Sequence, residues 1–142
     1  MKKVFITLVA AALGCLLLLS GCSKKISSIT DIERYSDMQK NADKIDVKFD
    51  NYSGEPFRFT ITNEDDLEEI MEILFSETLS YLGEEFPVGD NTFITIYQGE
   101  KSYSLSVRFI SENEKYYGFS PAKLQPKIKA IATALGAFDN VE

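Results

Sequence analysis

Residues 92–109 read TFITIYQGEKSYSLSVRF, and this stretch decides the fold because it predicts a β-hairpin. Its first part, Thr92 to Tyr97, is rich in β-branched and aromatic residues, which are favoured in strands. Gly99 lies in the polar turn that follows, where a positive φ can be needed. In the second part polar and apolar residues alternate, so one face is apolar and the other polar. The polar face, which we expect to meet water or a partner, carries Ser102, Ser104 and Ser106.

Two segments on either side of this hairpin show further strand patterns. Ile45 to Phe49 and Phe57 to Ile61 each have an apolar residue at every second position. Residues 52–55 between them have turn chemistry, so the two segments predict another hairpin. After a turn at 111–115, Tyr116 to Phe119 predicts a short third strand of the later group.

Two amphipathic helices are also predicted. Asn63 is a favourable N-cap, acidic residues fill the first turn, and apolar residues recur at helical spacing as far as Phe75. Residues 76–82 are ambiguous, because either the helix continues through them or a turn and a short edge strand replace it. The second helix begins near Gln125 and stops at Gly136. Its predicted apolar stripe consists of Leu124, Ile128, Ile131 and Leu135.

The resulting order of elements is β-β-α-β-β-β-α. Clean alternation indicates antiparallel strands with one covered face. We therefore predict a two-layer α+β domain, with an antiparallel sheet of about five strands and both helices on one face of it. This single domain is expected to span residues 43–142.

The N-terminal 21 residues have the organisation of a secretory signal peptide. Lys2 and Lys3 precede an apolar run from Val4 to Leu19, and the small residues Ser20 and Gly21 end it. One alternative is a transmembrane helix, but the run is shorter than the roughly 20 residues that span a bilayer. Another is an ordinary signal peptide, cut after Gly21, that leaves a free thiol.

The end of this segment carries a more specific motif. Leu19-Ser20-Gly21-Cys22 resembles the lipobox of bacterial lipoproteins. Together with the following lysines, the acidic-capped helix at 63–74 and the hairpin at 92–109, it makes the chain similar to small lipoproteins of Gram-positive bacteria. The resemblance implies removal of residues 1–21, a diacylglyceryl group on Cys22 and attachment to the extracytoplasmic side of the cell membrane. It transfers no functional residue except Cys22 and leaves the type of cell envelope open.

Residues 22–42 are predicted to form a lipidated polar tether. The segment is polar and charged, and we expect it to be a mostly disordered stalk with a short helix near 31–40. Its apolar residues are spaced by three, which is either a weak helical signal or chance. They are Ile26, Ile29, Ile32, Tyr35 and Met38.

Composition excludes several kinds of function. The chain has no histidine and no tryptophan, and Cys22 is the single cysteine of the mature form. Catalytic triads and nearly all zinc sites are therefore excluded, and no cofactor or metal is expected. Loss of residues 1–21 changes the formal net charge from −7 to −9, which does not suit a nucleic-acid ligand.

The candidate sites apart from Cys22 are weakly marked. The acidic run at 64–69 is interpreted as helix capping with a solvated face, and Glu84, Glu85 and Asp90 as loop carboxylates. Three strand tyrosines are a possible partner face, although packing is the commoner role of such residues. They are Tyr97, Tyr116 and Tyr117.

These observations favour a membrane-anchored, non-enzymatic binding or accessory domain with a possible protein partner. One alternative is a carboxylate-based hydrolase. Another is a protein inhibitor that presents the sheet or its loops. A third is a subunit whose open sheet edge pairs with another chain.

Overall fold

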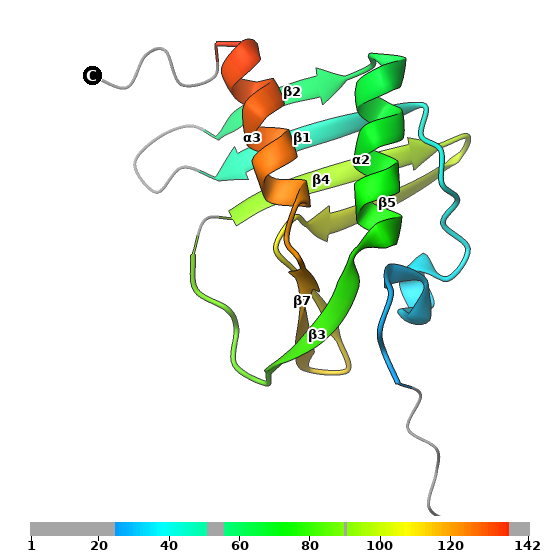
Figure 1. Cartoon of the computed structure of the whole chain (residues 1–142), viewed down its shortest axis with the longest axis vertical. Helices are drawn as coiled ribbons and strands as arrows, with labels where there is room; N and C mark the ends of the chain where they lie inside the picture. The colour runs from blue at the N-terminus through cyan, green and yellow to red at the C-terminus, as the bar shows by residue number, and fades with distance from the viewer. Residues whose placement is uncertain (1–24, 51–55, 90, 137–142) are drawn as a thin grey trace, which may run out of the picture.

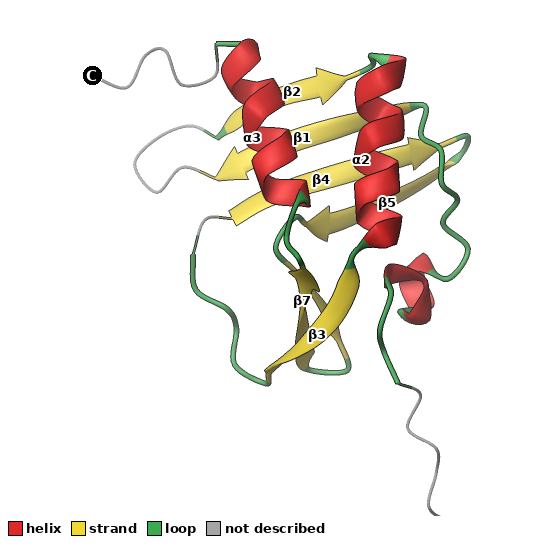
Figure 2. Cartoon of the chain, in the orientation of Figure 1, coloured by secondary structure: helices red, strands yellow, loops and turns green. Residues whose placement is uncertain are grey.

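The computed structural model describes residues 25–50, 56–89 and 91–136, which form an α+β fold with two antiparallel sheets. Sheet A has the strand order β2-β1-β4-β5 and sheet B the order β3-β7-β6. Figure 1 shows the arrangement, and Figure 2 separates helices from strands by colour. The strands of sheet A are β1 (Lys44–Asp50), β2 (Phe57–Ile61), β4 (Asn91–Gln98) and β5 (Lys101–Ser106). Those of sheet B are β3 (Thr78–Gly83), β6 (Phe109–Glu112) and β7 (Lys115–Ser120).

The α+β class and the antiparallel pairing are confirmed, but the single sheet of about five strands is wrong. The alternating stretch after Gly99 was expected to be one strand, yet it belongs to both sheets, as β5 and β6. The change of sheet falls at Val107 and Arg108: Val107 N donates to Thr92 O in sheet A, and Phe119 N in sheet B donates to Arg108 O. Strands often pass between sheets at such bends, and alternation alone does not reveal the bend.

Residues 76–82 also take the strand alternative. Helix α2 (Glu64–Ser76) ends at Ser76, and β3 follows after Glu77. The edge strand pairs with β7, with Leu79 opposite Phe119. The element order therefore becomes β-β-α-β-β-β-β-β-α, with two strands more than predicted.

Both helices lie on one face of sheet A, as expected (Figure 1). The alternating residues of the first hairpin pair in the predicted sense, with Val47 opposite Phe59. Helix α3 (Leu124–Ala134) buries Leu124 and Ile128, but Ala132 and not Leu135 completes its buried stripe. The helix ends at Ala134, so Leu135 is 58% exposed.

The described part of the predicted tether is packed onto the domain. We call residues 26–42 the strap. Of the five apolar residues spaced by three, four are buried and the fifth, Ile26, packs against the core. Two short 3-10 helices, η1 (Ile29–Asp31) and η2 (Glu33–Tyr35), form its centre. From residue 26 onwards, a mostly disordered stalk is therefore not what the structure shows.

The strap joins the two sheets through hydrogen bonds. Leu79 N in sheet B donates to Ser27 O at 2.8 Å, and Tyr35 Oη donates to Ser104 O in sheet A at 2.7 Å. Arg34 Nη2 reaches a carbonyl of β6 at 2.8 Å. The strap thus stabilises the packing of one sheet against the other and is part of the folded body.

Candidate functional site

The face of sheet A opposite the helices is the candidate site, because no described helix or strand covers it. We call it the open face. A hollow of about 560 Å³ lies on it, lined by residues that include Lys48, Arg58, Phe93, Thr95 and Tyr97. These side chains come from β1, β2 and β4, and they point outwards because neighbouring positions such as Ile94 and Ile96 fill the core.

Asp46 and the groups around it order one part of the open face. Thr60 Oγ1 donates to Asp46 Oδ1 at 2.7 Å, and Lys44 Nζ lies 3.9 Å from Oδ2. The same Nζ lies 4.2 Å from the centroid of the Tyr97 ring. The hydrogen bond from Thr60 lowers the pKa of Asp46, while hydrogen bonding to Asp46 raises the pKa of Tyr97. Asp46 is therefore ionised at neutral pH and Tyr97 keeps its phenolic proton.

Lys48 and Arg58 lie directly opposite each other on β1 and β2. Among the described residues that line the hollow, Lys48 and Arg58 are cationic and Asp46 is acidic. The whole chain has a net charge of −7, so the lining of this hollow is more cationic than the protein as a whole.

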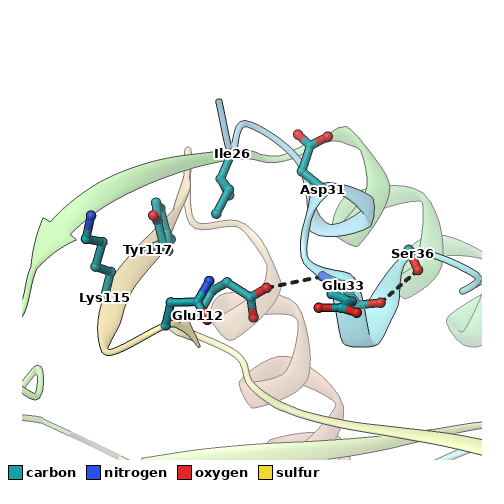
Figure 3. A pocket seen from close by; sticks show the side chains of 8 residues that line it. Ile26, Asp31, Glu33, Ser36, Glu112, Lys115 and Tyr117 are labelled. Carbon is teal, nitrogen blue, oxygen red and sulfur yellow. Dashed lines mark hydrogen bonds between the residues drawn. The ribbon is translucent and has the colours of Figure 1, made fainter. Parts of the chain in front are cut away.

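A second hollow, of about 550 Å³, separates the strap from the β6–β7 hairpin (Figure 3). Three carboxylates line it, but Figure 3 shows that those of Asp31 and Glu112 do not point toward each other. Asp31 Oδ2 accepts hydrogen bonds from Ser27 N and Ser28 N, both at 2.9 Å. These bonds lower the pKa of Asp31 to about 2.

Such a carboxyl group does not suit general acid catalysis, which needs a pKa raised toward the working pH. The pKa of Asp37 is lowered as well, by a hydrogen bond from Lys101, and that of Asp46 by Thr60. In the described ranges, no group of three or more acidic or sulfur ligands is placed to hold a metal ion. The arrangement around these carboxylates therefore favours structural roles.

The acidic run begins in the first turn of α2, and the N-cap of this helix is Asn63. Asn63 Oδ1 accepts from Asp66 N at 3.1 Å. Asp66 and Glu69 bind Lys127 Nζ of α3 at 2.8 and 2.6 Å, so part of this run links the two helices. In the loop after β3, Glu84 and Glu85 are exposed, and Asp90 lies outside the described residues.

The three predicted tyrosines do not share one surface. Tyr97 lies on the open face of sheet A, whereas Tyr116 and Tyr117 are neighbours on β7 of sheet B and so face opposite sides. The Tyr117 ring lies 5.8 Å from that of Tyr81, and Tyr116 contacts Phe86 at 5.7 Å. The lipobox residues Leu19, Ser20, Gly21 and Cys22 lie outside the described residues.

Sequence reasoning missed Lys48 and Arg58. In the sequence they are ordinary polar positions of two alternating strands. Only the register of the hairpin places them opposite each other, and a one-residue slip would pair other side chains. The signal that could have found them is their position on the polar faces of two strands that are predicted to pair.

No known protein-family model matches the chain, and neither the curated proteins nor the solved structures contain a match. Within the described ranges, neither helix combines the length and the apolar character that a membrane crossing requires. The geometry of the open face and the motif around Cys22 are thus the features from which a function can be inferred.

Proposed function

We propose that the protein is a lipid-anchored, non-catalytic binding domain on the outer side of the cell membrane, and that its open face binds an acidic segment of a partner protein. The observation that carries the proposal is the pairing of Lys48 with Arg58 on an uncovered face of an acidic chain. Cys22 is the attachment point.

The sequence supports the anchor. The run from Val4 to Leu19 ends in Ser20-Gly21-Cys22, as in lipoproteins cut before the cysteine. Each buried methylene of an acyl chain contributes about 0.8 kcal/mol, and two chains give stable attachment where one is marginal. A diacylglyceryl group on Cys22 would therefore hold the domain without any spanning helix.

Charge complementarity supports an acidic partner. An anionic group bound beside Lys48 and Arg58 would make charge-assisted interactions with both side chains. The rings of Phe93 and Tyr97 offer apolar area beside these charges. Because the hollow extends over several strands and opens to solvent, it suits a protein segment better than an enclosed small molecule.

A peptide titration tests the binding face. We expect an oligo-glutamate peptide to shift the NMR signals of backbone amides in β1, β2 and β4 in a saturable manner, and the affinity to fall as salt is added. An oligo-glutamine peptide of equal length should cause no such shifts. Replacing Lys48→Glu and Arg58→Glu together should abolish binding, because both cationic groups then repel the peptide.

The matched control is Lys129→Glu, a charge reversal on α3, in the helix layer behind sheet A. This variant should bind oligo-glutamate as the wild type does. Equal binding by the Lys48→Glu/Arg58→Glu variant would refute the assignment of the open face. Equal loss in the control would show that net charge, and not this face, governs the interaction.

A further inference from the structure

The end of sheet B remote from the helices carries exposed apolar side chains on both of its faces, with Tyr81 on the Tyr117 side and Phe86 on the Tyr116 side. Tyr81 and Leu82 lie near the end of β3, and Phe86 follows in the next loop. Their exposed fractions are 57%, 54% and 57%, respectively. We call these three residues the apolar end. In the loop beyond them, Val88 is 88% exposed.

This patch is held rigidly. The Phe86 ring packs edge-on against Phe109 at 5.3 Å and against Tyr116 at 5.7 Å. Leu82 lies over Gly118, where an added Cβ would approach its side chain to 3.1 Å. The apolar end is thus part of the folded sheet, although more than half of each side chain meets solvent.

The chain enters the fold at this same end. Ser27 O accepts from Leu79 N of β3 at 2.8 Å, and Ile26 lines one hollow with Tyr117, whose ring contacts Tyr81. In Figure 1, the first described residues and the tip of β3 both lie at the lower end of the molecule. Ile26 and Ser27 therefore lie beside β3 and β7, on the side that carries Tyr81 and Tyr117.

The chain between this point and Cys22 is short. Cys22 precedes Lys25, the first described residue, by three positions. Three residues span at most about 10–11 Å when fully extended. Each polar layer of a bilayer is about 5–8 Å thick, given a hydrocarbon core of about 30 Å within a total of about 40–45 Å. An anchor on Cys22 therefore holds this end of the domain at the headgroups.

We infer that the apolar end docks into the headgroup layer of the membrane to which Cys22 is attached, an inference that rests on the proposed anchoring. Tyrosine and other aromatic side chains are favoured at this depth, where one end of the ring meets apolar chains and the other water. The anchor keeps the patch at a high effective concentration, so weak contacts suffice to orient the domain.

The charges nearby define the kind of surface. Glu84, Glu85 and Glu114 are exposed at this end and outnumber the exposed cationic residues there, Lys25 and Lys115. Electrostatic attraction to an anionic membrane is therefore not what holds the patch. Insertion of apolar side chains drives the docking, and a zwitterionic bilayer is the matching probe.

Single tryptophans report the docking, because the wild-type chain has none. The full chain, carrying Phe86→Trp or Leu82→Trp, is produced and processed in a lipoprotein-making bacterium and reconstituted in phosphatidylcholine vesicles. We expect emission at shorter wavelength than in the fully exposed state, and quenching by phosphatidylcholine with brominated chains. The control is Tyr97→Trp on the open face, whose emission should escape quenching. Circular dichroism confirms that each variant is folded.

The possible results separate the two proposals. Lipid missing from Cys22 by intact mass overturns the anchoring and, with it, the basis of docking. If Cys22 is lipidated, docking alone is overturned when either folded probe is quenched no more than Tyr97→Trp. Emission at short wavelength without quenching by brominated lipid also overturns it, because a second copy of the chain would then cover the patch.

Discussion

Glu77 shows how a single side chain can link elements that the sequence keeps apart. It is the residue after α2, is 2% exposed, and its Oε1 accepts hydrogen bonds from Lys123 N and, at 3.3 Å, from Leu124 N. Both N–H groups lie at the start of α3, where the side chain of the N-cap residue makes no capping hydrogen bond. A carboxylate at this position also interacts favourably with the helix dipole.

Loss of this carboxylate should destabilise the fold. We expect Glu77→Ala to lower the free energy of unfolding by about 1–3 kcal/mol, because the N–H groups of Lys123 and the buried Leu124 lose their acceptor. Urea unfolding followed by circular dichroism measures the change. Glu77→Gln retains an acceptor oxygen and should lose less. The exposed Glu72→Ala, on the same helix, should stay within about 0.5 kcal/mol of wild type. Equal midpoints for Glu77→Ala and wild type would contradict this role.

Asp31 makes the stability of the strap depend on pH. Its pKa is lowered from 3.8 to about 2 by hydrogen bonds from the backbone N–H groups of Ser27 and Ser28. A lowered pKa in the folded state means that the ionised group stabilises the fold above pH 3.8. This contribution disappears as the pH falls through about 2.

The prediction is a difference between Asp31→Asn and the wild type that depends on pH. Above about pH 4 the variant should unfold at lower urea concentration, and by about pH 2 the two midpoints should converge. Comparing the two proteins at each pH cancels the titration of the other carboxylates. A constant gap across this range would show that ionisation of Asp31 does not contribute.

At the scale of elements, the strap is the segment whose structure could not be predicted from the sequence. The strands from Ile45 to Ile61 and from Thr92 to Tyr97 could be predicted because their alternation has the period of a sheet surface. The apolar residues of the strap have a period of three instead. Ile29 and Tyr35 belong to two separate three-residue 3-10 helices, and Ile32 between them is extended. Such short elements leave a pattern too short to distinguish from chance.

The candidate site shows a similar limit. The sequence predicts the polar faces of β1 and β2 correctly, but which side chains oppose each other depends on the register across an intervening loop. The division of the strands into two sheets could not be predicted for the same reason, because it also depends on which strands pair. Alternation continues from Tyr103 through Phe109, so nothing local marks the transfer at Val107.

A core substitution in the strap tests whether it belongs to the domain. We expect Ile32→Ala to lower the free energy of unfolding by about 2–5 kcal/mol, because Ile32 is 0% exposed and its loss leaves a cavity. The adjacent Glu33→Ala is the control, since its side chain is exposed and should matter by no more than about 0.5 kcal/mol. Thermal and urea melts should agree. If the strap were only a tether, both variants would have the stability of the wild type.

At the scale of the whole molecule, three surfaces have different chemistry. The helix layer is acidic, with exposed Glu64, Asp65 and Glu68 on α2. The open face of sheet A is cationic and aromatic, and the apolar end of sheet B is the place where the chain enters the fold. Docking of that end would leave the open face, on the other sheet, accessible to a partner. The two proposals are therefore compatible in one orientation of the domain.

The two cysteines offer a matched test of the anchor on which that orientation depends. Cys22→Ala removes the thiol that would carry lipid, so the chain should keep residues 1–21 and lose incorporation of a labelled fatty acid. Cys15→Ala changes the other cysteine, inside the apolar run, and should be processed and labelled as the wild type is. Intact mass and metabolic labelling measure both effects. Lipid labelling of the Cys22→Ala variant would refute anchoring at Cys22. Loss of lipid labelling in the Cys15→Ala variant would indicate that Cys15 is needed for the modification. Because Ile26, four positions after Cys22, already packs against the core, the outcome decides whether the domain is held at the bilayer surface or is free to leave it.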